Sequence, residues 1–124
     1  MTVHLDTSAL IGALTGKRRS LDRLLALSQE GHRLAISSLV LYEWRRGPRT
    51  DEELNAQEAL LPSDIAVPFG PAEAALAAQL YQQLPKSRGR ELDLAIAATA
   101  VANGAAVLTL NPHDFKDVPD LRLV

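Results

Sequence analysis

Acidic side chains occur at three separate places in the sequence where they could act together on a metal ion. Asp6 follows a short apolar segment, Glu43 lies between two aromatic residues, and Asp93 precedes an Ala/Ile-rich stretch. Mg2+ binds to oxygen ligands and keeps several waters that substrate phosphates can share. A cation held by these acids could activate water and stabilise charge on a phosphate being cleaved. The sequence leaves open whether one metal or two would bind.

The expected positions of these acids bring them toward one edge of a sheet. Asp6 comes at the end of one strand, and Asn111 and Asp114 follow the end of another. In open parallel sheets, ligands bind beyond the carboxyl ends of the strands. Glu43 lies in the helix after the second strand, and Asp93 opens the helix that leads to Asn111. We therefore expect all four segments to converge.

The elements that position these residues are predicted from the spacing of apolar residues and from turn and capping signals. We expect strands at 2–5, 34–36, 106–110 and 121–124. We expect helices from about residue 9, with Thr7 or Ser8 as the cap, and over 20–30, 39–46, 51–61, 71–84 and 92–102. Short apolar strands alternating with amphipathic helices indicate an α/β fold, a three-layer sandwich with a mainly parallel central sheet flanked by helices.

Size and composition favour one domain over residues 1–124. The chain has 124 residues, 47% of them hydrophobic, which is enough for one core but not for two independent ones. The absence of cysteine excludes disulfides, thiolate zinc sites and cysteine nucleophiles. The start lacks the basic region of a signal peptide, and no apolar run approaches the ~20 residues of a membrane-spanning helix. We expect a soluble cytoplasmic protein.

Positive charge is concentrated although the net charge is −2. Ten of the 13 Lys and Arg residues fall in three short segments. Two of these segments lie near the acids in sequence, and their candidate RNA-binding residues are Arg45, Arg46, Lys86, Arg88 and Arg90. Cations there could hold RNA phosphates beside a metal. The alternative is that they are ordinary solubilising charges.

Four motifs in order resemble those of PIN domains of the VapC toxin type. They are LDTSAL at 5–10, SSLVLYEWRRG at 37–47, DLAIAATA at 93–100 and TLNPHDF at 109–115, followed by a closing VPDLRLV. The resemblance covers almost the whole chain. It implies a PIN-like fold and an endoribonuclease that uses Mg2+, with Mn2+ as a plausible substitute. It also implies a homodimer and neutralisation by a cognate VapB-like antitoxin.

The resemblance also assigns roles to individual residues. Asp6, Glu43 and Asp93 match the three metal-binding acids of the family, and Thr109 matches the threonine beside the metal. The sequence departs from the family pattern at Asn111, where a fourth acid is common. Either the neutral Asn111 fills that place, or Asp114 contributes through water. A further accessory residue is Ser8, for which helix capping and contact with a metal-bound water are equally supported.

Simpler interpretations of the same residues remain open. Taken alone, Asp6 could belong to the capping of a helix, Asp93 could be a partner of a helix dipole, and Glu43 could simply face solvent. A missing fourth acid could also mark a catalytically weak PIN-like scaffold that binds RNA or another protein. A phosphate-binding loop is not supported, because GALTGKR at 12–18 has the wrong glycine spacing and Arg18 in place of Ser or Thr.

Overall fold

The computed structural model describes all residues from 1 to 124 and contains a parallel sheet. Its strands are β1 (Thr2–Leu5), β2 (Arg33–Ala35) and β3 (Ala106–Leu108), in the order β2-β1-β3. Isolated parallel bridges extend the sheet at both edges, from Ser37 to Val67 and from Val107 to Leu123. The predicted parallel sheet is confirmed. The predicted last strand over 121–124 is reduced to pairing around Leu123.

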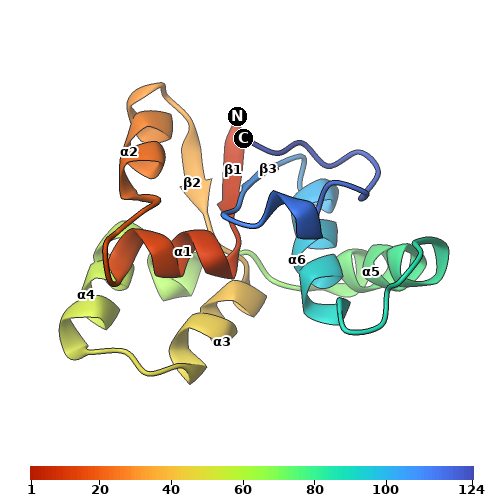
Figure 1. Ribbon diagram of the computed structural model, residues 1–124, viewed down its shortest axis with the longest axis horizontal. Helices are drawn as coiled ribbons and strands as arrows, with labels where there is room; N and C mark the ends of the chain where they lie inside the picture. Colours follow the sequence, from red (N-terminus) through yellow and green to blue (C-terminus); the bar gives the residue numbers. More distant parts are fainter.

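Six α-helices surround these strands. They are α1 (Thr7–Leu14), α2 (Leu21–Gln29), α3 (Ser38–Arg46), α4 (Asp51–Leu60), α5 (Pro71–Gln83) and α6 (Glu91–Ala102), with short 3-10 helices η1 (Ser63–Ile65) and η2 (Pro112–Asp114). In Figure 1, α2 and α4 lie on the β2 side of the sheet, α5 and α6 lie on the β3 side, and α1 and α3 lie below the ends of the strands. The α/β sandwich with flanking helices is therefore as predicted. No helix is long and apolar enough to cross a membrane.

Two helices at the candidate site, α1 and α3, begin at residues whose side chains cap them. The carboxylate of Asp6 caps α1 by accepting a hydrogen bond from the Ala9 amide at 2.9 Å. Thr7 and Ser8, which were predicted to provide this cap, lie inside the helix. Ser37 caps α3 by accepting a hydrogen bond from the Val40 amide at 3.2 Å. An oxygen at the cap position satisfies an amide that the helix itself leaves unpaired, so local chemistry orients Asp6.

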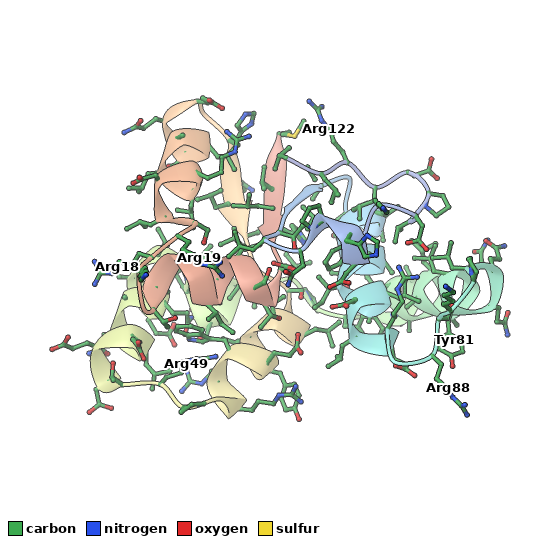
Figure 2. The ribbon with its side chains drawn as sticks, in the orientation of Figure 1. Arg18, Arg19, Arg49, Tyr81, Arg88 and Arg122 are labelled. Atoms are coloured by element: carbon green, nitrogen blue, oxygen red, sulfur yellow. The ribbon has the colours of Figure 1, made fainter.

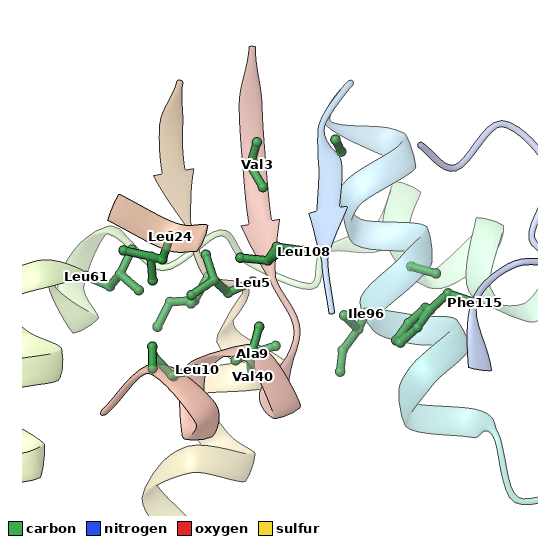
Figure 3. Packing of buried hydrophobic residues seen from close by; sticks show 14 of the residues in the cluster. Val3, Leu5, Ala9, Leu10, Leu24, Val40, Leu61, Ile96, Leu108 and Phe115 are labelled. Atoms are coloured by element: carbon green, nitrogen blue, oxygen red, sulfur yellow. The ribbon is translucent and has the colours of Figure 1, made fainter. Parts of the chain in front are cut away.

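One continuous core joins β1 to helices on both sides. Figure 3 shows Leu5 and Leu108 of the strands packed between residues of the flanking helices, with Ile96 and Phe115 on the α6 side. Leu5 is fully buried, and burial of a leucine side chain contributes roughly 1.5–3 kcal/mol. In α6, every residue from Leu94 to Ala100 is buried. The carboxyl end of β1 and the amino end of α6, which carry Asp6 and Asp93, are thereby fixed relative to each other.

Candidate active site

Asp6 is held rigidly where β1 ends. Its backbone amide donates to the Leu108 carbonyl at 3.1 Å, which ties it to β3, and the residue is only 4% exposed. One carboxylate oxygen accepts hydrogen bonds from the Ala9 amide and, at 2.7 Å, from the Ser8 hydroxyl. The other accepts from the Thr109 hydroxyl at 2.6 Å. Three donors therefore fix both oxygens of this buried carboxylate.

The two predicted accessory residues join the ends of β1 and β3. Ser8 Oγ accepts a hydrogen bond from the Leu110 amide at 3.0 Å, and Thr109 Oγ1 accepts one from the Asn111 amide at 2.9 Å. The two hydroxyl oxygens lie 3.3 Å apart. Each hydroxyl thus links Asp6 to the backbone that follows β3. Ser8 therefore does not cap α1. It orients Asp6, which is the cap.

Glu43 faces the start of α1 from the neighbouring helix α3. Thr7 Oγ1 donates a hydrogen bond to Glu43 Oε1 at 2.5 Å, and Glu43 Oε2 lies 3.5 Å from Arg46 Nη2. The Glu43 side chain is 16% exposed. The sequence predicted Thr7 only as a possible helix cap and not as a partner of Glu43, although its hydroxyl directly follows Asp6 in LDTSAL. Thr7 directs Glu43 toward the site instead of toward solvent.

Asp93 is the acid with the most perturbed ionisation. It lies in the first turn of α6, and its carboxylate accepts no hydrogen bond from another residue. Burial, which has the largest effect, and the like charges of Asp114, Asp6 and Glu43 together raise the pKa of Asp93 from 3.8 to about 6. Arg90 acts in the opposite direction. The charges of four acids from four segments therefore act on one another.

The pKa of Asp6 is raised as well, and for a related reason. Burial raises it, and this effect outweighs the hydrogen bonds from Thr109, Ala9 and Ser8, which lower it. The charge of Glu43 raises the pKa of Asp6 further. Desolvation and like charges both disfavour ionised carboxylates. A cation among these acids would relieve both effects.

The acids suit a hard cation, but they do not form a closed cage. All donors are carboxylate or hydroxyl oxygens, which Mg2+ and Mn2+ accept. No group of three or more histidine or acidic side chains could hold a metal as the side chains stand. Mg2+ commonly uses one or two carboxylates and completes its coordination with water. The donor set therefore fits an ion held partly through water.

The structure distinguishes the two residues considered for the fourth position. Asn111 is exposed, and its side chain makes no hydrogen bond within the protein. Asp114, in η2, exerts the largest like-charge effect on Asp93. Because of this electrostatic coupling we propose Asp114, and not the neutral Asn111, for the fourth position.

Most of the predicted RNA-binding cations are already paired with acids. Arg90 forms a fork with Asp117 at 2.6 and 2.9 Å and also donates to the Asp114 carbonyl at 3.0 Å. Arg46 pairs with Glu43, and Arg45 lies 3.4 Å from Glu58. The two that form no ion pair, Lys86 and Arg88, are exposed in the loop before α6. The direct structural role of Arg90 is to hold the segment after β3 against the start of α6.

The fold and these acids define an α/β protein with an acidic site beyond the carboxyl ends of a parallel sheet. The chain belongs to the PIN-domain family, whose sequence profile matches residues 3–121. It is 32% identical over 120 residues to Ribonuclease VapC19 of Mycobacterium tuberculosis, with 95% of each chain covered.

Solved structures of VapBC complexes share the fold. The chain is similar to one in a crystal structure of VapBC2 from Rickettsia felis bound to a promoter DNA fragment. The TM-score is 0.75 and the identity 26%, with 100% of this chain and 98% of that chain covered. A chain in DNA-bound VapBC from Salmonella typhimurium gives a TM-score of 0.75 at 22% identity, covering 100% and 97%. The predicted PIN-like fold is confirmed.

Proposed function

We propose that this chain is an endoribonuclease that hydrolyses RNA phosphodiester bonds with Mg2+, or with Mn2+ in its place. The observation that carries the proposal is the gathering of acids at one edge of the sheet, where Thr109 and Ser8 hold Asp6 and Thr7 holds Glu43. Burial and the like charges of the other acids raise the pKa of Asp93 there to about 6. Structural ion pairs usually stabilise charge, whereas this arrangement concentrates like charge in a half-buried place. The similarity to Ribonuclease VapC19 supports RNA as the substrate.

Each acid has a distinct part in this proposal. Asp6, Glu43 and Asp93 would hold the cation, and Asp114 would act through water. A bound divalent cation supplies activation of water and stabilisation of charge on the phosphate. Ser8 and Thr109 keep the Asp6 oxygens in place, and Thr7 does the same for Glu43. Because the pKa of Asp93 is about 6, this acid is mostly ionised at neutral pH and can bind a cation there.

RNA cleavage by the purified chain tests the activity. We expect cleavage that requires Mg2+ or Mn2+ and that falls at least 100-fold in Asp93→Asn, since the loss of a metal ligand removes several kcal/mol of charge stabilisation. Asp22→Asn makes the same chemical change at an exposed acid of α2 and should leave the rate unchanged. Equal rates in wild type and Asp93→Asn would contradict the proposal and favour a scaffold that binds RNA without cutting it.

We also propose that the chain is a cytoplasmic VapC-like toxin that forms a homodimer and is neutralised by a cognate VapB-like antitoxin. The support is the similarity to chains from VapBC complexes, including VapBC2 of Rickettsia felis. An arginine or lysine of the antitoxin could pair with the acidic site. Expression of the chain should arrest growth, and co-expression with the protein encoded beside it should restore growth and yield a stable complex. A harmless chain with no affinity for that neighbour would contradict the toxin role.

A further inference from the structure

A groove with a basic end runs along α1 from the acidic site. Its volume is about 400 Å3. Its lining includes Asn111 and Ser8, whose hydroxyl donates to Asp6, and also Lys17, Arg18 and Arg19. Figure 2 shows Arg18 and Arg19 beside α1, whereas Arg88 projects from the loop that follows α5. The groove thus connects the acids to a basic segment that sequence analysis did not assign to RNA binding.

Gly12 of α1 lies in the lining of the groove and is closely packed against two side chains. A Cβ atom at Gly12 would lie 2.6 Å from Leu110 Cδ1 and 2.9 Å from Ser20 Oγ, closer than carbon atoms pack. Leu110 and Gly12 both line the groove, so the absence of a side chain at Gly12 allows Leu110 to pack against α1 there. No L-residue with a side chain fits there without displacing Leu110 or Ser20.

The segment that carries the three cations is ordered by hydrogen bonds to α1. Ser20 Oγ donates to the Ala9 carbonyl at 2.6 Å, and the Ser20 amide donates to the Gly12 carbonyl at 3.2 Å. Within the turn, the Arg18 amide donates to the Thr15 carbonyl at 3.0 Å, with Arg18 at a left-handed φ of 53°. The loop is attached to the same helix that Asp6 caps. The backbone that carries the three cations is therefore held against α1 before any ligand arrives.

These three cations also lack acidic partners. The ion pairs of the structure are His32–Glu30, Arg45–Glu58, Arg46–Glu43 and Arg90–Asp117, and none includes Lys17, Arg18 or Arg19. All three residues are exposed. Adjacent uncompensated positive charges repel one another and attract a polyanion. Because the net charge of the chain is −2, this attraction is local to the basic segment and not a property of the whole surface.

We propose that this groove binds the backbone of single-stranded RNA, with Lys17, Arg18 and Arg19 holding phosphates on one side of the bond to be cleaved. The inference rests on the proposed ribonuclease function and adds the path of the substrate. Cations that contact phosphates position RNA without reading its sequence. The groove therefore supplies affinity and placement, and the acids supply the chemistry.

Binding of a fluorescent single-stranded RNA, measured by anisotropy in EDTA over a range of salt concentrations, tests the proposal. The variant is Lys17→Ala/Arg18→Ala/Arg19→Ala. The control, Arg23→Ala/Arg33→Ala/Arg122→Ala, removes the same charge from exposed residues that do not line the groove. Each phosphate contact contributes about 0.7 to the slope of log K against log salt for single strands, so the groove variant should lose about 2 from this slope. Its affinity at low salt should fall at least tenfold, and that of the control should fall less than threefold.

Cleavage separates this inference from the function on which it rests. In the groove variant, KM should rise while kcat stays within a few-fold of wild type. If the alanine variant melts lower than wild type, glutamine at the same three positions preserves side-chain length and gives the same comparison. If wild type cuts no RNA but the groove variant shows the predicted loss of RNA binding, the ribonuclease proposal is overturned and the groove proposal is supported. Equal salt slopes and equal RNA affinities in the groove and control variants would overturn the groove proposal. So would unchanged RNA binding with lost affinity for the neighbouring antitoxin, because the groove would then serve a protein segment.

Discussion

Asp6 and Asp93 carry the same functional group, but the site surrounds the two carboxylates differently. Asp6 is 4% exposed and accepts hydrogen bonds from Ala9, Ser8 and Thr109. Asp93 is half-buried, accepts no hydrogen bond from another residue and has a pKa raised to about 6. The first carboxylate is part of the folded structure, since it begins α1 and ties β1 to β3. The second contributes repulsion to the folded chain and is stabilised by a proton or a cation.

The largest difference between Asp6 and Asp93 should appear in the free energy of unfolding when each acid is replaced by alanine. Asp6→Ala removes the cap of α1 and leaves two hydroxyls without their acceptor, which should cost about 2 kcal/mol of unfolding free energy. Asp93→Ala removes a charge that the fold disfavours and should increase stability by about 1 kcal/mol after screening by solvent. Urea denaturation at pH 7 in EDTA measures both. A change of the same sign in both variants would remove the distinction.

The pH dependence of stability should reveal the contribution of Asp93. The folded-state pKa of Asp93, about 6, lies above its usual value of 3.8, so the folded chain favours the protonated acid. Below pH 3.8 both states hold the proton and there is no penalty. As the pH rises toward and through 6, the folded state must carry the charge and stability is lost.

Asp93→Asn cannot titrate and provides the matched comparison for this loss. The variant should equal wild type in stability near pH 3.5 and exceed it by on the order of 1 kcal/mol at pH 7, with solvent screening included. Melting in EDTA across this range measures the difference. A constant difference at all pH values would show that Asp93 titrates normally.

The smallest expected effect concerns Arg90, which influences the pKa of Asp93 but not that of Asp6. Its guanidinium lowers the pKa of Asp93 and pairs with Asp117, whereas it is not among the groups that shift Asp6. Arg90→Gln should therefore raise the pKa of Asp93 and leave that of Asp6 in place, at a stability cost of about 0.5 kcal/mol for a partly exposed pair. Carboxyl NMR titration resolves the two acids. Arg88→Gln is the control, and an equal shift in both variants would show only a general charge effect.

The same contrast explains how much the sequence could predict. The strand before Asp6, the helix bearing Glu43 and the helix opened by Asp93 follow from local patterns of apolar and capping residues, and all three were predicted. That Asp6 caps α1 in place of Thr7 or Ser8 was not predicted, because three adjacent residues can all cap a helix.

Contacts between distant segments were harder to anticipate. Arg90 was predicted to bind RNA, but it pairs with Asp117, 27 residues later in the chain. The support for Asp114 over Asn111 depends on how the segment after β3 folds back toward α6. Lys17, Arg18 and Arg19 are distant in sequence from Asn111, yet they line one groove with it. Hydrophobic spacing predicts elements, whereas these pairings arise only after the elements have packed.

The most direct test of the central claim, that these acids gather to bind a divalent cation, is thermal melting of wild type and Asp93→Asn in EDTA and in excess Mg2+. In EDTA, Asp93→Asn should melt higher because it lacks one repelling charge. In excess Mg2+, wild type should melt higher, since a ligand that binds only the folded state stabilises it in proportion to the logarithm of its concentration over its Kd. This inversion is the result that we predict. If Mg2+ shifts both proteins equally, Asp93 does not bind the cation, and if it shifts neither, the acids do not form a metal site.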